Sequence, residues 1–155
     1  MAYVKLGATL KDCEELAPIL REEDLKECRA IHTEDLTALK ALEQAVKASV
    51  KTFAVIGDQE TCIAIFGVGE FNEGAGGCPW MLSSDELFDN HSREFRKQCK
   101  GFAMELAKGY KWLMNYVATD NKKAIKWLTW LGFTVDFTRP VTFGNVSFNP
   151  FWYKE

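Results

Sequence analysis

The sequence predicts a single α/β domain with a mixed central β-sheet flanked by helices. Its 155 residues are the length of one ordinary domain. Hydrophobic residues make up 47% and charged residues 26%, a composition typical of a folded globular protein. Segments with strand-like alternation are interleaved with segments of helical period. Strand–helix–strand passages favour parallel pairing and hairpins favour antiparallel pairing, so we expect one mixed sheet over residues 1–155.

The N-terminal third is predicted to hold one short strand and two or three helices. Tyr3–Ala8 alternates apolar and polar residues, as a strand does. Apolar residues at helical spacing follow, and Pro18 is expected to break a helix or to lie in a first turn. These apolar residues are Leu16, Ile19, Leu20, Leu25, Cys28 and Ile31. Asp35 is the expected N-cap of a further helix that runs to Val46.

The middle of the chain changes to the period of strands. Thr52–Ile56 and Thr61–Val68 flank a short polar turn, which predicts a β-hairpin. Phe71–Gly77 is rich in glycine and polar residues and is predicted to be a loop, whereas Cys78–Ser83 is a compact apolar strand. Asp89–Ser92 then offers capping side chains for a long helix. Its apolar stripe is Phe95, Cys99, Phe102, Ala103, Leu106, Ala107 and Tyr110.

The C-terminal part is predicted to contain a strand, a helix and closing strands. Trp112–Ala118 is an apolar strand, and Asn121–Leu131 is an amphipathic helix that ends at Gly132. The expected closing strands are Phe133–Phe137, Val141–Phe143 and Val146–Tyr153.

Composition excludes several classes of protein. The net charge of −3 argues against a nucleic-acid partner, because phosphates favour a concentrated basic surface. No apolar run approaches the ~20 residues that cross a bilayer, and no secretory leader opens the chain, so we expect a soluble cytoplasmic protein without a membrane partner. Five cysteines without metal-binding spacing are expected to be reduced core residues. No spacing predicts a metal site.

The segment Trp112–Phe133 carries a resemblance to a known family. A strand ends, Asn121 opens a helix, an apolar face follows, and the helix stops at Gly132-Phe133. This pattern resembles the second half of the core of the GNAT acetyltransferase superfamily, and the order of elements fits the GNAT plan over nearly the whole chain. The resemblance implies a GNAT-like mixed central sheet.

A closer resemblance extends from Cys78 to about Phe133. Its features are a Trp in the strand, a Ser-Asp pair after it, and short motifs in the long helix and the next strand. The motifs are Phe95-Arg96-Lys97, Gly109-Tyr110-Lys111 and Asn115-Tyr116-Val117, followed by Asn121. Together they are similar to the small GNAT-like internal virion or virion-assembly proteins of short-tailed phages of the T7 group. This similarity implies a protein of the host-cell cytoplasm or of the virion.

The GNAT resemblance implies acetyl-CoA as cofactor, but the residues of the expected phosphate loop argue against it. The family holds the pyrophosphate on a glycine-rich loop before the long helix, whereas Ser83–Arg93 contains no glycine. Asp85, Glu86 and Asp89 would repel a dianion there. If acetyl-CoA does bind, the resemblance places it against six residues. These are Leu82, Ser83, Ser92, Arg93, Lys97 and Asn121. The helical pattern favours a solvated face for Arg96 and Lys97, opposite Phe95 and Cys99.

No residue is assigned a catalytic role. Leu128 occupies the place where the family commonly has a tyrosine that protonates the departing thiolate, and leucine cannot donate a proton. The nearest tyrosine, Tyr116, lies on the preceding strand. The strand Cys78–Ser83 carries no acid, and Glu70, Glu73, Asp85 and Glu86 are expected to be solvated.

Aromatic residues concentrate toward the C-terminus. Trp130 falls off the apolar face of its helix, and Phe148, Phe151, Trp152 and Tyr153 follow within a short stretch. We expect some of them to form an exposed patch for self-association or a protein partner. The leading hypothesis is a non-catalytic or weakly catalytic assembly protein that binds protein. The alternatives are an acetyl-CoA-dependent N-acetyltransferase acting on a host protein and a module that senses CoA or a nucleotide.

Overall fold

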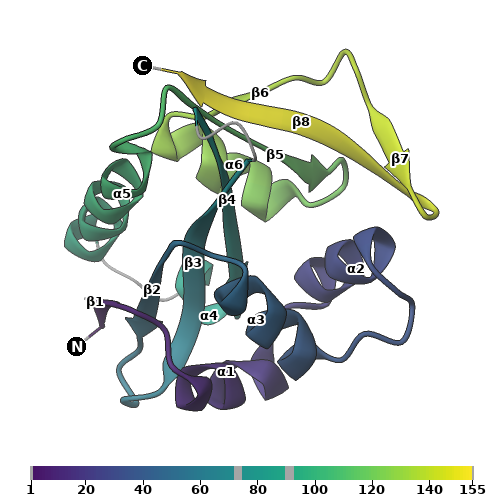
Figure 1. Cartoon of the computed structure of the whole chain (residues 1–155). Helices are drawn as coiled ribbons and strands as arrows, with labels where there is room; N and C mark the ends of the chain where they lie inside the picture. Colours follow the sequence, from purple (N-terminus) through teal and green to yellow (C-terminus); the bar gives the residue numbers. More distant parts are fainter. Residues whose placement is uncertain (1, 72–74, 90–92, 155) are drawn as a thin grey trace.

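The computed structural model describes residues 2–71, 75–89 and 93–154. The strands form one eight-stranded mixed sheet in the order β1-β2-β3-β4-β5-β8-β6, with β7 paired to β8 (Figure 1). The strands are β1 (Tyr3–Leu6), β2 (Lys51–Ile56), β3 (Cys62–Glu70), β4 (Gly76–Ser83), β5 (Trp112–Ala118), β6 (Thr134–Val135), β7 (Val141–Phe143) and β8 (Val146–Lys154). The helices are α1 (Leu10–Leu16), η1 (Ala17–Ile19), α2 (Glu22–Ile31), α3 (Ala38–Lys47), α4 (Glu86–Asp89), α5 (Arg93–Ala107) and α6 (Lys122–Leu131). The predicted α/β class with a mixed sheet is confirmed.

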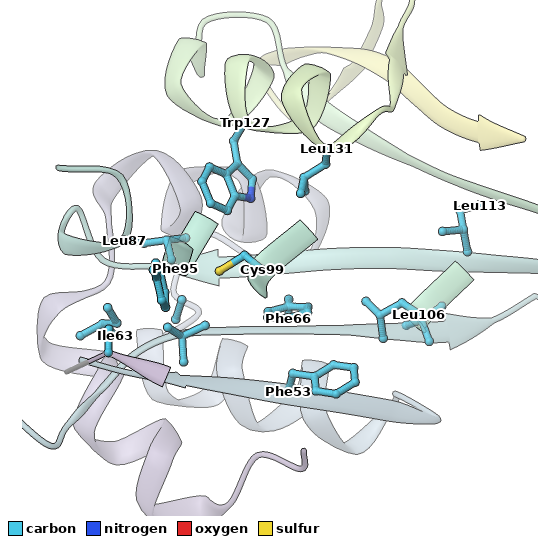
Figure 2. Close-up of a cluster of buried hydrophobic side chains, with 14 residues drawn as sticks. Phe53, Ile63, Phe66, Leu87, Phe95, Cys99, Leu106, Leu113, Trp127 and Leu131 are labelled. Carbon is cyan, nitrogen blue, oxygen red and sulfur yellow. The ribbon is translucent and has the colours of Figure 1, made fainter. Parts of the chain in front are cut away.

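Two hydrophobic layers cover the two faces of the sheet. Alternate residues of β2 serve opposite layers: Phe53 and Val55 pack with α5 and α6, and Ala54 and Ile56 pack with α1 and α3. Figure 2 shows the first layer, in which Trp127 of α6 points toward the long helix and the sheet. The cores therefore place α5 and α6 on the opposite side of the sheet from α1 and α3.

Helix α6 begins and ends where the sequence predicts. The Asn121 side chain accepts a hydrogen bond from the Ala124 N–H, and Gly132 takes the left-handed C-cap conformation at φ +106°. Ala124 and Leu131 are buried, and Leu128 is partly buried against the cluster of Val117, Ala124 and Phe151. The element that carries the GNAT resemblance is therefore confirmed.

Several local expectations were wrong. Thr37, not Asp35, caps α3, because its Oγ1 accepts from the Lys40 N–H at 3.2 Å. The strand expected at Cys78 begins at Gly76. Asp89 ends a short helix, α4, that the sequence did not predict, and the remaining capping candidates, residues 90–92, lie outside the described residues.

All five cysteines are free thiols, and Cys13, Cys62 and Cys99 are buried, as expected of core residues. No helix in the described part of the chain has the length and apolar character needed to span a bilayer.

The parting of β4 and β5 is the feature that positions the candidate site. These parallel neighbours pair only at Gly76–Trp112 and Gly77–Leu113, near their N-terminal ends. The Asn115 Nδ2 donates to the Pro79 carbonyl at 2.7 Å, just beyond the last pair. From there the strands diverge, and β5 pairs along its whole length with β8 instead.

Candidate functional site where β4 and β5 part

Two carboxylates of α2 bind the backbone at the far ends of the parted strands. The Ser83 N–H at the end of β4 donates to Asp24 Oδ2 at 2.9 Å. The Ala118 N–H at the end of β5 donates to Glu27 Oε1 at 2.7 Å. Backbone N–H groups that have lost a strand partner must find another acceptor when they are buried. Helix α2 supplies both acceptors and so spans the gap between the strands.

Arg21, directly before α2, lies at the centre of the polar cluster. Its side chain is only 1% exposed. Nη1 lies 3.1 Å from Asp24 Oδ1, and Nη2 donates to Asn121 Oδ1 at 2.9 Å. The Arg21 N–H also donates to the Ser83 carbonyl at 2.9 Å. A buried guanidinium needs such charged and polar partners to offset its lost hydration.

Asn121 joins this cluster to α6. Its Oδ1 serves both the Arg21 guanidinium and the first turn of α6. Its Nδ2 donates to Glu27 Oε1 at 3.1 Å and lies 3.5 Å from Asp24 Oδ1. With 1% of its surface exposed, Asn121 has its side chain fully used inside the protein.

Burial raises the pKa of both carboxyl groups. The pKa of Asp24 rises to about 6, and the Arg21 charge and the Ser83 N–H oppose this rise. The pKa of Glu27 rises to about 7, opposed by its hydrogen bonds from Ala118 and Asn121. Glu27 therefore titrates near neutral pH, at the contact between α2 and β5.

An apolar cavity lies on the other side of the parting, between α5, α6 and the sheet. Its volume is about 70 Å³, and it is lined by hydrophobic side chains. They include Met81, Leu87, Cys99, Leu113, Trp127 and Leu128. Cavities of ~150 Å³ admit one benzene molecule, so this cavity holds nothing larger than a few atoms.

The segment between β4 and α5 closes the space beside this cavity. Phe88 of α4 packs edge-on against Trp127 of α6, with ring centroids 5.6 Å apart. Lys123 Nζ lies 3.5 Å from Asp85 Oδ1 and 3.3 Å from Asp89 Oδ1. These contacts attach the expected phosphate loop to the first turns of α6.

The model of the family described as Bacteriophage T7, probable scaffold protein Gp13, matches residues 52–138, more than half of the chain. The chain belongs to this family. No curated protein sequence gives a significant match to this Gp13-family chain.

Solved structures with the same fold are GNAT acetyltransferases. The ribosomal-protein-alanine N-acetyltransferase of Brucella melitensis is 14% identical, with a TM-score of 0.68 and 99% of each chain covered. The spermidine N-acetyltransferase of Vibrio cholerae, solved with CoA and spermine, is 14% identical at a TM-score of 0.65, covering 97% of this chain and 95% of the other. A putative acetyltransferase of Salmonella typhimurium, solved with acetyl-CoA, is 14% identical at a TM-score of 0.63, covering 99% and 94%. The Gp13-family chain therefore has the GNAT fold.

The residues predicted to contact a cofactor lie in different places in the Gp13-family chain. Ser83 and Asn121 are buried around Arg21, and Leu82 is buried in the core with α1 and α3. Arg93 and Lys97 are exposed on α5, and Ser92 lies outside the described residues. The Ser83 N–H and carbonyl, at the end of β4, are already used by Asp24 and Arg21.

Sequence reasoning missed the three residues in and directly before α2 that define the site. Arg21, Asp24 and Glu27 recur at a spacing of three, which places them on one side of a helix beside Leu25 and Cys28. That periodicity was the available signal. In the described part of the chain, no group of three or more metal-ligating side chains is gathered.

The predicted aromatic patch is corrected in part. Phe148 and Phe151 of β8 are buried in the core, with 0% and 5% of their surface exposed. Trp152 and Tyr153 are partly buried. Trp130 of α6 is 39% exposed, as its position off the apolar face predicts.

Proposed function

We propose that this GNAT-fold protein of the Gp13 family acts in phage assembly by binding protein, and that it does not transfer acetyl groups. The observation that carries the proposal is the position of α2. Asp24 and Glu27 satisfy backbone groups of both parted strands, where an inserted ligand would need to bind. A ligand at this position would have to displace both carboxylates and leave Arg21 without its main partner.

The contacts of the expected phosphate loop support the same conclusion. Asp85 and Asp89 are bound by Lys123, and Phe88 packs on Trp127, so the loop is attached to α6. The exposed Asp85 and Asp89 carboxylates would repel a pyrophosphate at this loop. The apolar cavity of about 70 Å³ is smaller than the ~150 Å³ that admits one benzene molecule. These contacts support the proposal that the chain does not bind acetyl-CoA.

The chain also offers no proton donor at the place that the family uses. Leu128 lines the apolar cavity. Tyr116 packs edge-on against Phe143 of β7, with ring centroids 5.3 Å apart. Transfer of an acetyl group would lack the general acid that protonates the leaving thiolate.

The family model describes a probable scaffold protein, and scaffolds act through protein contacts. We infer that the chain works in the cytoplasm of the infected cell or in the assembling particle. The exposed Trp130 is the aromatic side chain best placed to anchor a partner.

Isothermal titration calorimetry with acetyl-CoA tests the proposal. The Salmonella typhimurium acetyltransferase, which was solved with acetyl-CoA, is the positive control. We expect saturable heat from the control and none from this protein. A low-micromolar dissociation constant, equivalent to ~8 kcal/mol of binding free energy, would contradict the proposal and favour the acetyltransferase hypothesis. Weakening of that binding by Arg93→Ala or Lys97→Ala would then identify the phosphate contacts.

A further inference from the structure

The charge of the chain is divided between its two parts. Residues 1–92 contain 8 Lys and Arg against 17 Asp and Glu, whereas residues 93–155 contain 11 against 5. The small net charge of −3 therefore conceals an acidic part and a basic part. Such segregation creates a long-range field that can orient a binding partner.

The basic charge gathers on α5 and α6. We call this the basic face, and its exposed cations are Arg93, Arg96, Lys97, Lys100, Lys122 and Lys126. Trp130 lies among them, with Lys100 Nζ 5.5 Å from its ring centroid. Glu94 is the one acid in the first two turns of α5. The neighbouring Lys123 is already paired with Asp85 and Asp89.

Acidic charge gathers around α1, α3 and the turn between β2 and β3. We call this the acidic end, and it consists of Glu14, Glu15, Glu43, Asp58 and Glu60. Its field reaches the buried thiols beneath it. The pKa of Cys13 is raised by burial and then by Asp12, Glu43 and Glu14, and the pKa of Cys62 is raised to about 12 by burial, Asp12 and Glu15. Exposed Lys11 on α1 and exposed Lys40 and Lys47 on α3 reduce this negative charge without reversing it.

The basic face and the acidic end lie on opposite sides of the sheet. The core under α5 and α6 is separate from the core under α1 and α3. In Figure 1, α5 and α6 accordingly lie apart from α1, with β2 and β3 between them. One molecule therefore cannot bring its own basic face and acidic end together, but two molecules can.

We propose that the basic face binds the acidic end of a second copy of this chain, in a head-to-tail contact with Trp130 as its aromatic anchor. This inference rests on the proposed protein-binding function and names the partner. Each contact leaves one basic face and one acidic end free, so the geometry yields a chain of copies or a closed ring, not a symmetric pair. Duplex DNA is the alternative partner of the basic face. The acidic rest of the molecule disfavours it, because the DNA backbone carries one negative charge per ~1.7 Å.

Salt dependence is the first test, by sedimentation velocity over a range of protein concentrations. At about 20 mM salt charges interact over about 20 Å, and at about 500 mM over about 4 Å. We expect the sedimentation coefficient of the wild type to rise with concentration at low salt and to stay at the monomer value at high salt. A monomer at low salt throughout the concentration range would overturn the proposal.

Charge reversal is the second test. Lys97→Glu with Lys126→Glu reverses the basic face, and Glu14→Lys with Glu43→Lys reverses the acidic end; all four side chains are exposed. Each double variant alone is expected to associate at least about tenfold more weakly than the wild type. Mixed in equal amounts they should associate again, because each presents a face opposite in sign to the other. Recovery in the mixture also shows that both variants are folded.

Two results would contradict the assignment of the surfaces. One is unchanged association of either double variant, and the other is failure of the mixture to recover. If the basic face binds a duplex DNA oligonucleotide and the protein does not self-associate, the partner is nucleic acid and not a second copy. That result would also overturn the proposal. Failure of the head-to-tail contact can be told apart from failure of the proposed function. The acetyl-CoA titration tests the proposed function and does not depend on self-association.

Discussion

Glu27→Gln should make the protein more stable above neutral pH. The Glu27 carboxyl accepts from the Ala118 N–H and from Asn121 Nδ2 through the same oxygen, Oε1. A glutamine side chain keeps a carbonyl oxygen for both bonds but carries no charge. The substitution therefore removes the cost of ionising this group without removing its contacts.

The size and sign of the effect follow from the pKa of Glu27. Burial raises it from 4.5 to about 7, so the folded state holds this proton more tightly than the unfolded chain. Stability from this group is therefore complete below pH 4.5 and is lost as pH rises through 7. A pKa rise of this size corresponds to a loss of about 3 kcal/mol in the free energy of unfolding of the wild type at high pH. Partial relaxation of the structure around the charged carboxylate reduces this loss to about 2 kcal/mol. The Arg21 and Asp24 charges, which also face Glu27, oppose each other in this shift.

Urea denaturation at several pH values between 5 and 9 measures the effect. The free energies of unfolding of wild type and Glu27→Gln should be similar at pH 5, and the variant should be the more stable at pH 8 and above. Glu22→Gln, at an exposed position of the same helix, is the control and should follow the wild type. Below pH 6, the unfolding free energy of the variant should still change with pH, because Asp24, whose pKa is about 6, titrates there. A Glu27→Gln protein that is less stable than wild type at pH 8 would refute the reasoning.

Two further pairs of substitutions test the structure by urea denaturation. Asn121→Ala removes a helix cap and an acceptor of the buried Arg21 guanidinium, so it should cost about 3 kcal/mol, whereas Asp120→Ala removes only an exposed ion pair and should cost less than about 1 kcal/mol. Equal costs would contradict the role of Asn121. Gly101→Ala, in the middle of α5 with no atom within 4 Å of the added carbon, should stabilise by about 0.5–1 kcal/mol. Gly76→Ala should destabilise by about 1–3 kcal/mol, because its new carbon would meet the Trp112 ring; a neutral result would show that the ring moves freely.

Local signals in the sequence predicted most of the elements. Helix α6 is the clearest case, because its cap residue, its apolar spacing and its terminal glycine all act within a few residues of one another. The short helix α4 lacks such a period, since it has only four residues. Its single buried residue, Leu87, packs in the core under α5 and α6, which no local pattern could indicate.

The tail aromatics show where a strand rule fails. We expected some of these aromatics to be exposed, because a strand with one solvated face buries only alternate residues. Strand β8 instead lies between β5 on one side and β6 and β7 on the other. Phe148 packs on Phe143 and Phe151 packs on Phe133, each with ring centroids 5.3 Å apart. Phe148 and Phe151 point to opposite faces of β8, and each is buried against an aromatic neighbour from another segment.

For the candidate site, the sequence predicted which typical GNAT residues are absent, but not which residues take their place. The glycine-free loop and Leu128 are visible in the sequence because the GNAT resemblance fixes their positions. The contact between Arg21 and Asn121 joins residues one hundred positions apart, and only the folded chain brings them together. The spacing of Arg21, Asp24 and Glu27 shows that they share a helix side but not what that side binds.

Amide hydrogen exchange at Ser83 and Ala118, measured with and without acetyl-CoA, tests the central claim most directly. Helix α2 spans the gap between β4 and β5, and the carboxylates of Asp24 and Glu27 accept from these two N–H groups. We therefore expect both amides to exchange slowly and acetyl-CoA to change neither rate. Fast exchange at both amides in the free protein, followed by protection when acetyl-CoA is added, would show an open site that takes the cofactor and would contradict the account.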